Sequence, residues 1–419
     1  MNTNPFKPPM RILHTSDWHI GHRLHDNDRY EEHQLFLNWL LGAIDDNKVE
    51  LLIVAGDIFD TANPTHQALT QYYEFLRQLI KTCCRDIIII GGNHDSYGTL
   101  NAPKDILKYF NIHIVGKAHE NCMDEVIVIK DRKDKIQTVV CAVPFLRDRD
   151  IRQAITGESY ADIEQRIKEG IIRRYRNLAD CMAQYKSQPF PVLATGHLYA
   201  AGGTFSDTTD KSERDIHIGN LGQIRADEFP AEFDYIALGH LHRPQMVNNQ
   251  RNIRYAGSPI PLSFSEFSDK KVILLLDFEN NQLHGIEEIT IPSWRQLVRL
   301  KGNFNQLANQ IQLIGEGKKG MKIWAEVKVE LDQYEPYITQ KVNELVKNRN
   351  VVVLKTQAIY THQHQSLDEQ LGQEKALHEL KPEEVFRKKC ESEKFDIDGY
   401  PDVMGAFKEL LSEMEENHD

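Results

Sequence analysis

Three short apolar segments alternate with two amphipathic stretches near the N-terminus, and this alternation restricts the fold more than any other feature of the sequence. The apolar segments are 11–16, 50–56 and 86–90. Residues 31–47 and 69–80 place their apolar side chains three or four positions apart, as on one face of a helix. Strands that alternate with helices at this spacing form βαβ units, so we expect an α/β fold with a mostly parallel sheet whose two faces are covered.

The rest of the chain continues this pattern and then changes character at Pro292. Further strands are expected at 126–129, 138–143, 191–196 and 235–239, and an amphipathic helix at 160–186. Residues 293–358 predict a small βαβ-like module, because two helical stretches separate β-type segments. We therefore expect three parts, 1–290, 291–360 and a polar tail at 361–419.

The composition indicates a water-soluble protein of a reducing compartment. Hydrophobic residues make up 41% of the chain and charged residues 27%. No stretch approaches the roughly 18 consecutive apolar residues that a membrane helix needs. The six cysteines are scattered without a repeated Cys-x-x-Cys spacing, so we expect reduced thiols rather than a zinc site or a disulfide framework. The expected location is the cytoplasm.

The net charge of −12 is unevenly distributed along the chain. Residues 361–419 hold 7 Lys and Arg against 16 Asp and Glu, whereas residues 291–360 hold 11 against 6. A basic module within an acidic chain is typical of a surface that meets a polyanion, although solvated charged faces give the same pattern. Both interpretations stay open at this point.

Five of the expected strands are followed by side chains that bind metals. The segments are Asp17-x-His19, Gly56-Asp57-x-x-Asp60, Gly92-Asn93-His94-Asp95, Gly196-His197 and Gly239-His240-x-His242. The carboxyl ends of strands in an open α/β sheet border a common crevice, so segments far apart in sequence can converge there. Glycine precedes the ligand in four of them, which allows a sharp turn. Any one motif can arise by chance or for structural reasons, but their ordered conjunction predicts a metal centre.

The types of these side chains indicate the chemistry of the centre. Imidazole, carboxylate and amide groups without thiolate suit Mn²⁺, Fe²⁺ or Zn²⁺ better than Ca²⁺ or Mg²⁺. Seven candidate ligands are too many for one octahedral ion, so we expect two ions, and paired cations favour hydrolysis of a phosphate ester. His94, beside Asn93, is the candidate proton donor. Asp95 is expected to fix the orientation of the His94 ring.

The motifs "TSDWHIG", "VAGDIFD", "GGNHDS", "GHLH" and "YAGSPIPLSFSE" together resemble those of the calcineurin-like metallophosphoesterase superfamily. Within it they are similar to the nuclease subunits of bacterial SbcCD-type complexes, which repair DNA double-strand breaks. Protein phosphatases are disfavoured, because positions 56–62 read "GDIFDTA" where that branch has Gly-Asp-x-Val-Asp-Arg-Gly. The resemblance covers essentially the whole chain and is strongest over 11–275.

The resemblance implies a role for each site residue. One ion would be held by Asp17, His19, Asp57 and His242, and the other by Asp57, Asn93, His197 and His240, with Asp57 as the bridge. His94 is the implied catalytic histidine, with Asp95 next to it, and the implied cofactor is two Mn²⁺ ions. Archaeal and eukaryotic relatives carry histidine where this chain has Asp60. The role of Asp60, behind the ligands or beside the substrate, therefore stays open.

The resemblance also implies an architecture and partners. Residues 1–290 would form a nuclease domain, a sandwich of two sheets flanked by helices, followed by a small α+β capping domain at 291–360 that contacts DNA. Candidate DNA-binding residues are Lys318, Lys319, Lys322, Lys328, Lys347 and Arg349. Residues 361–419 would form a linker and a helical tail that docks an SbcC-like ATPase of the SMC family. An apolar stripe in this tail either docks that partner or packs back on its own domain. Its residues are Val403, Phe407, Leu410, Leu411 and Met414.

The implied activity is a Mn²⁺-dependent 3′-to-5′ exonuclease on duplex DNA ends and an endonuclease on single strands or hairpins, acting in DNA repair, recombination and replication. The implied assembly is a homodimer within a heterotetramer, with helices near 66–81 and 101–110 as the candidate dimer surface, in the cytoplasm with the nucleoid. Two alternatives remain. One is a phosphoesterase for a small substrate, against which the long C-terminal extension counts, and the other is a non-catalytic scaffold, against which the complete ligand set counts.

Overall fold

The structure, a computed structural model, contains two compact units that are described separately. The described residues are 10–151, 159–185, 190–200, 224–315, 317, 320–360, 383, 386, 387, 389, 390, 395 and 397–416. The first unit comprises Met1–Val298 with Gly317–Ile323, and the second comprises Arg299–Glu316 with Trp324–Asp419. The predicted division into three parts stays a prediction.

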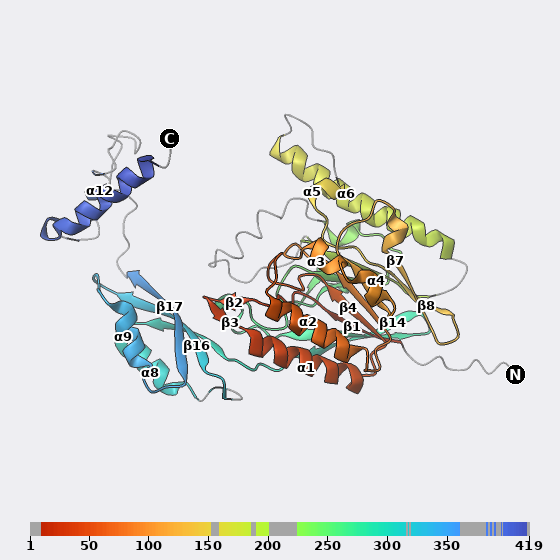
Figure 1. The fold of residues 1–419 in the computed structure, drawn as a ribbon, viewed down its shortest axis with the longest axis horizontal. Helices are drawn as coiled ribbons and strands as arrows, with labels where there is room; N and C mark the ends of the chain where they lie inside the picture. Colours follow the sequence, from red (N-terminus) through yellow and green to blue (C-terminus); the bar gives the residue numbers. More distant parts are fainter. Residues whose placement is uncertain are drawn as a thin grey trace. The chain divides into compact units, whose positions relative to one another are not determined.

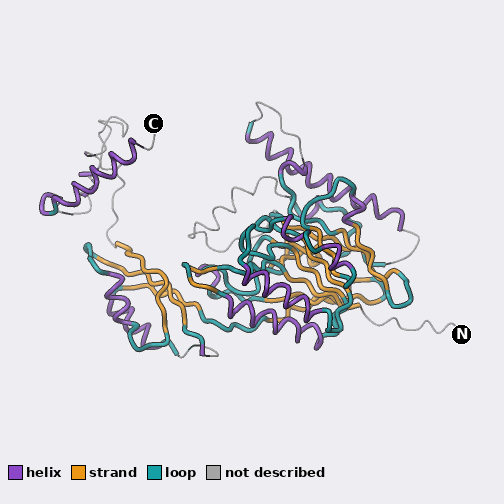
Figure 2. The backbone as a smooth tube through the Cα atoms, viewed as in Figure 1, coloured by secondary structure: helices purple, strands orange, loops and turns teal. Residues whose placement is uncertain are grey.

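The first unit contains two six-stranded sheets, which are seen in orange in Figure 2. One has the order β14-β13-β1-β4-β5-β6, with β1 (Met10–Thr15), β4 (Leu51–Ala55), β5 (Asp86–Ile90), β6 (Ile112–Val115), β13 (Val272–Glu279) and β14 (Gln282–Thr290). Its β1, β4, β5 and β6 are parallel, and β13 pairs with β1 in the antiparallel sense. The predicted βαβ series is therefore confirmed, with an antiparallel pair of strands added at one edge.

The second sheet has the order β11-β12-β10-β9-β8-β7. Its strands are β7 (Val126–Lys130), β8 (Ile136–Cys141), β9 (Val192–His197), β10 (Tyr235–Gly239), β11 (Gln245–Val247) and β12 (Gln250–Tyr255). The strands β8, β9, β10 and β12 are parallel, so their carboxyl ends lie on the same edge of the sheet. The short strands β2 (Arg23–Leu24) and β3 (Asn27–Asp28) form a separate ribbon.

Helices cover the outer face of each sheet, and the inner faces pack on each other (Figure 1). The helices α1 (Tyr30–Asp46) and α2 (His66–Leu79) bury Phe36 and Phe75 against the first sheet. The helix α6 (Tyr160–Cys181) buries Tyr175 against the second. Between the sheets lies an aliphatic layer that includes Ile53 and Leu193. This order of layers confirms the predicted two-sheet sandwich.

The first unit also contains three short helices, and its cysteines bear on the expected redox state. These helices are α3 (Tyr97–Asn101), α4 (Lys104–Lys108) and α5 (Asp148–Ile151). The helix expected near 101–110 is present in shorter form as α4. It begins after Pro103, which lacks the backbone donor that a helix interior requires and separates α4 from α3. The structure also places Cys122 next to Cys181, because the turn after Asn121 packs on the end of α6. Their Cα atoms are 7.4 Å apart, farther than a disulfide of regular geometry spans, so the expectation of reduced thiols stays a prediction for this pair.

The second unit contains a three-stranded sheet, β15-β16-β17, with two helices. Its elements are β15 (Leu297–Gly302), α8 (Phe304–Leu313), β16 (Ile323–Leu331), α9 (Ile338–Leu345) and β17 (Val351–Tyr360). The buried Glu326 forms ion pairs with Arg299, at 2.6 Å, and with Lys355, at 3.4 Å. The expected α+β module is present. Of its candidate DNA-binding residues, Lys322, Lys347 and Arg349 are exposed, Lys328 is half-buried, and Lys318 and Lys319 lie outside the described residues.

The tail contains the helix α12 (Pro401–Glu416), on which the predicted apolar stripe lies. Val403 and Leu410 are 38% and 53% exposed, so the part of the stripe that they form is not covered. Phe407 stacks on Phe386 with 4.0 Å between the ring centroids. The side chain of Met414 lies outside the described residues. Among the residues that are described, no helix is both long and apolar enough to cross a membrane.

Candidate metal centre

The carboxyl ends of β1, β4 and β5 in one sheet meet those of β9 and β10 in the other. Backbone hydrogen bonds join the turns: the N–H of Asp17 donates to Gly56 O at 3.0 Å, and the N–H of His19 donates to Asp57 O at 3.0 Å. Across the two sheets, the N–H of His240 donates to Oδ1 of Asp17 at 2.8 Å. The edge at which the predicted ligands were expected to converge is thus formed by both sheets.

Asp57 lies in the middle of the predicted ligands. Its Oδ2 atom is 3.5 Å from Nε2 of His19 and 3.2 Å from Nε2 of His197, so one carboxylate oxygen faces imidazoles from both sheets. Its Oδ1 atom accepts the backbone N–H of His94 at 2.9 Å. A carboxylate in this position can face two cations at once.

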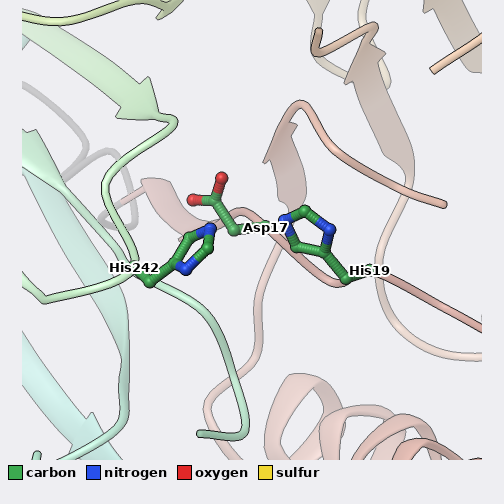
Figure 3. A group of neighbouring side chains, drawn as sticks. All are labelled: Asp17, His19 and His242. Carbon is green, nitrogen blue, oxygen red and sulfur yellow. The ribbon is translucent and has the colours of Figure 1, made fainter. Parts of the chain in front are cut away.

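The remaining six ligands form two groups, one on each side of Asp57. The first ligand group is Asp17, His19 and His242, whose ligand atoms all lie within 4.8 Å of one another; Asp17 lies between the two rings in Figure 3. The second ligand group is Asn93, His197 and His240. Its central atom is Oδ1 of Asn93, which is 3.0 Å from Nε2 of His197 and 3.1 Å from Nδ1 of His240. All seven predicted ligands are therefore brought together.

The ring of His19 shows that the residues present fit a metal ion. Both ring nitrogens of His19 are buried and lack a hydrogen bond of regular geometry: Nδ1 lies 3.3 Å from Oδ1 of Asp60, and Nε2 lies 3.5 Å from Oδ2 of Asp57. A buried polar atom without such a partner is costly, and this cost is removed when a ligand binds it. The donor set of imidazole, carboxylate and amide oxygen suits Mn²⁺, Fe²⁺ or Zn²⁺.

Four of the ligands have backbone conformations that L-residues seldom adopt. The φ angles are +51° at Asp17, +46° at His19, +49° at Asp57 and +100° at His240. Such values persist only where the surrounding structure imposes them, and they concentrate at functional sites. Glycine is also required beside them, because a Cβ on Gly92 would lie 2.1 Å from Oδ1 of Asp57.

Electrostatics couples the ligands to one another. Burial would raise the pKa of Asp57, but the positive charge and hydrogen bond of His197 outweigh it and lower this pKa well below its usual range. Burial would in turn lower the pKa of His197, but Asp57 raises it to about 9. Burial, with the charge on His197, lowers the pKa of His240 to about 3. The negative charge of Asp57 therefore favours a positively charged partner at this position.

His94 and Asp95 lie at this edge, but their relation differs from the expected one. Nδ1 of His94 lies 2.8 Å from the backbone oxygen of Asp60. The carboxylate of Asp95 instead accepts backbone N–H groups from Ile58, Phe59 and Gly92 at 2.9 to 3.1 Å. Burial, followed by the charge of Asp57, raises the pKa of Asp95 to about 6. The expectation that Asp95 orients the His94 ring is wrong; Asp95 joins the two turns that carry Asp57 and Asn93.

Sequence reasoning named Asp60 and left its role open, but it missed the other residues that lie behind the histidines. Oδ1 of Asp60 lies 3.3 Å from Nδ1 of His19 and 2.9 Å from Nδ1 of His22. Oε1 of Glu266 lies 3.4 Å from Nδ1 of His242, and the buried Lys271 forms an ion pair with the same carboxylate. Glu266 ends the motif "YAGSPIPLSFSE", which is a usable signal, whereas no pattern in the sequence points to His22.

Two stacked six-stranded sheets with histidines, aspartates and an asparagine at their shared edge define a metallophosphoesterase. The sequence profile of the family described as "Calcineurin-like phosphoesterase" matches residues 10–244, more than half of the chain. A second profile, "Type 5 capsule protein repressor C-terminal domain", matches residues 293–394.

Whole-chain similarity narrows the family further. The chain is 34% identical to the SbcD component of nuclease SbcCD from Escherichia coli (strain K12) over 411 residues, 98% of this chain and 100% of that protein. It is 30% identical to the protein of the same name from Bacillus subtilis (strain 168) over 323 residues, 76% of this chain and 79% of that protein. The chain belongs to the SbcD family of calcineurin-like phosphoesterases, which confirms the resemblance seen in the motifs.

Proposed function

We propose that the chain is a two-metal DNA phosphodiesterase, the nuclease subunit of an SbcCD-type complex. Its proposed reactions are 3′-to-5′ exonucleolytic cleavage of duplex ends and endonucleolytic cleavage of single strands and hairpins. The proposal rests on the position of Asp57. Its Oδ2 atom faces both His19 and His197, which come from different sheets. The proposed compartment is the cytoplasm, where chromosomal DNA is the substrate.

In this proposal the first ligand group and Asp57 hold one Mn²⁺ ion, and the second ligand group and Asp57 hold the other. When bound, such a pair supplies an activated nucleophile and neutralises charge on the phosphate. The protein contributes the geometry. The turns that carry the ligands are fixed before substrate binds, by the positive φ angles at Asp17 and His240 and by the backbone hydrogen bonds that the Asp95 carboxylate accepts. Preorganised ligands lower the cost of reorganisation during the reaction.

His94 is the proposed proton donor to the leaving oxygen. Its Nδ1 faces the Asp60 backbone oxygen, an acceptor, so Nδ1 keeps its hydrogen. The proton given to the leaving oxygen is the second one, which the charged ring carries on Nε2. Its ring lies 4.9 Å from that of His19, between centroids, which places it at the border of the metal site. A histidine in this position can donate a proton or a hydrogen bond to the phosphate ester.

A basic and aromatic cluster near the His94 turn favours a polyanionic substrate. The ammonium of Lys117 and the guanidinium of Arg147 lie 5.2 Å and 5.6 Å from the centre of the Tyr97 ring. Tyr97 follows the "GGNHDS" motif directly, and the segment before Arg147 joins the same edge through the N–H of Phe145, which donates to Gly91 O at 2.8 Å. Lys117 and Arg147 would neutralise the phosphates that flank the cleaved bond. In the second unit, Lys347 and Arg349 are the proposed further DNA contacts.

The deciding experiment compares linear duplex DNA with bis-p-nitrophenyl phosphate under Mn²⁺. A nuclease degrades the DNA from its 3′ ends only when Mn²⁺ is present, and 3′-labelled substrates report the polarity. Turnover of the small ester without any cleavage of DNA would favour the small-substrate alternative. No turnover of either substrate, with Mn²⁺ bound, would favour the non-catalytic scaffold.

We propose that the chain forms a homodimer through α2, α4 and the turn that follows α4. Ile106, Tyr109 and Phe110 are 68%, 89% and 50% exposed, and Tyr73 and Ile80 of the neighbouring helix region are 38% and 39% exposed. Such a group of large apolar side chains is typical of a surface that another molecule covers. Light scattering of the Ile106→Glu, Tyr109→Glu double variant is expected to show one copy where the parent shows two. The control is Leu313→Glu, which changes an equally exposed side chain of α8 and should stay dimeric.

We propose that α12 docks an SbcC-like ATPase, two copies of which complete a heterotetramer. Its exposed Val403 and Leu410 are the contact residues, and the net negative charge of the tail argues against DNA in this role. Replacing both with glutamate is expected to abolish co-purification of a large coiled-coil ATPase from lysate, while hydrolysis of the small ester continues. Retention of the ATPase by this variant would exclude the helix as the docking site.

A further inference from the structure

Each histidine of the first ligand group has a carboxylate at the ring nitrogen that faces away from the ligands. Nδ1 of His19 lies 3.3 Å from Oδ1 of Asp60, and Nδ1 of His242 lies 3.4 Å from Oε1 of Glu266. In both rings Nε2 is left to face the metal position, and for His19 it lies 3.5 Å from Oδ2 of the shared Asp57. Two carboxylates thus support two imidazoles that belong to the same ion.

The two carboxylates are held by one continuous network. Oδ1 of Asp60 binds Nδ1 of His22 at 2.9 Å, and Nε2 of His22 lies 2.9 Å from the backbone oxygen of Leu262. The N–H of Leu262 in turn donates to Oε2 of Glu266 at 3.3 Å. The ammonium of Lys271, which is almost fully buried, binds the same oxygen and keeps the Glu266 carboxylate charged. Asp60 and Glu266 are therefore fixed relative to each other.

The second ligand group is supported differently. Nδ1 of His197 lies 2.9 Å from the backbone oxygen of Ala55, which is a neutral acceptor. The group also contains Asn93, a neutral amide, where the first ligand group has the carboxylate Asp17. A carboxylate partner makes an imidazole a stronger metal ligand and fixes its tautomer, and loss of such a partner commonly weakens metal binding about 10- to 100-fold.

We infer that the two metal positions are unequal: the first ligand group fills first and binds its ion more tightly, because Asp60 and Glu266 act as positioning residues for His19 and His242. This inference rests on the proposed two-metal site. It also assigns Asp60 to a place behind the ligands rather than beside the substrate. Relatives that carry histidine in place of Asp60 would lack its negative charge behind the ion of the first ligand group.

The test measures Mn²⁺ binding to the metal-free, full-length chain without DNA, by calorimetry and by electron paramagnetic resonance. Two backgrounds isolate the positions: Asn93→Ala leaves the first ligand group intact, and His242→Ala leaves the second intact together with the hydrogen bond from the N–H of His240 to Asp17. Asp60→Asn is then placed in each background, because it keeps the size of the side chain and removes its charge. Glu266→Gln is the second variant, with Asp269→Asn as its control. Asp269 is three residues away and pairs with Arg243 at 3.0 Å.

The unsubstituted chain is expected to bind two Mn²⁺ ions in two separable steps. Asp60→Asn should weaken binding about 10- to 100-fold in the Asn93→Ala background and change it less than about threefold in the His242→Ala background. When Asp60→Asn is the only substitution, the spin-coupled signal of two neighbouring Mn²⁺ ions should appear only at a higher Mn²⁺ concentration than in the unsubstituted chain. A purely structural role would shift the melting temperature and weaken both positions together.

Equal weakening of both positions by Asp60→Asn, or an effect no larger than that of Asp269→Asn, would overturn the inference. So would two identical binding steps in the unsubstituted chain. If that chain instead binds no pair of Mn²⁺ ions at any concentration, the proposed two-metal function itself fails, and the two failures are thus distinguished. Since Glu266→Gln leaves the buried Lys271 without its counter-ion, this variant can fail to fold, and the Asp60→Asn result then decides alone.

Discussion

Replacing Asp57 with asparagine is expected to remove DNA cleavage and the binding of a pair of Mn²⁺ ions together. Oδ2 of Asp57 faces both His19 and His197, so this one substitution withdraws negative charge from both metal positions. Charge stabilisation by bound cations amounts to several kcal/mol, and about 1.4 kcal/mol corresponds to a tenfold change in rate. We therefore expect the cleavage rate to fall by roughly 10³-fold or more, measured with end-labelled duplex DNA at saturating Mn²⁺.

The matched control is Asp277→Asn. This aspartate lies on β13 of the same sheet and pairs with Arg11 at 3.0 Å, far along the chain from any predicted ligand. It should cleave DNA at the parental rate. A circular dichroism spectrum shared by both variants would establish that the sheet is intact. Cleavage by Asp57→Asn within tenfold of the parent would exclude the bridging position of this carboxylate.

Replacing His94 with glutamine is expected to separate metal binding from catalysis. The His94 ring is held through Nδ1 by the Asp60 backbone oxygen, and its backbone N–H donates to Oδ1 of Asp57, so the side chain borders the site without being one of the seven expected ligands. Loss of a general acid typically costs 10²- to 10⁴-fold in rate, and we expect a loss of about that size. Calorimetry should still show two bound Mn²⁺ ions.

His94 lies close enough to His19 and Asp57 to be a metal ligand itself. The number of Mn²⁺ ions bound by the variant therefore decides between the two roles of His94. If the variant loses an ion, His94 is a ligand rather than a proton donor. The control is His113→Gln, on β6 of the same sheet, whose ring lies 3.8 Å from Asp86 and away from the ligand turns. Normal cleavage by His94→Gln would remove the proposed catalytic role.

The local pattern of the sequence was sufficient to predict the elements and the candidate ligands. Apolar spacing predicted α1, α2 and the strands β1, β4 and β5, whose observed ends lie within a few residues of the expected ones. Candidate ligands follow strands directly in the sequence, and parallel strands end at one edge. Their convergence is therefore a consequence of chain order.

The partners of the ligands could not be predicted in this way. The carboxylate of Asp17 accepts the N–H of His240 across 223 residues, and Asn93 meets His240 across 147. Such contacts depend on how one sheet packs on the other, and no local pattern records that packing. The expected pairing of Asp95 with His94 was wrong for a different reason: the Asp95 carboxylate is directed to the backbone N–H groups of Ile58, Phe59 and Gly92.

By itself, then, the sequence determined the α/β class, the seven candidate ligands and the family, because strand and helix periods and the residues that follow each strand are local properties of the chain. Only the tertiary structure decided which oxygen faces two imidazoles, which carboxylates stand behind His19 and His242, and that Asp95 joins two turns instead of orienting His94. These contacts join side chains from different turns, some at the edge of one sheet and some across the two sheets. Their positions are therefore set by the tertiary packing and not by the local sequence.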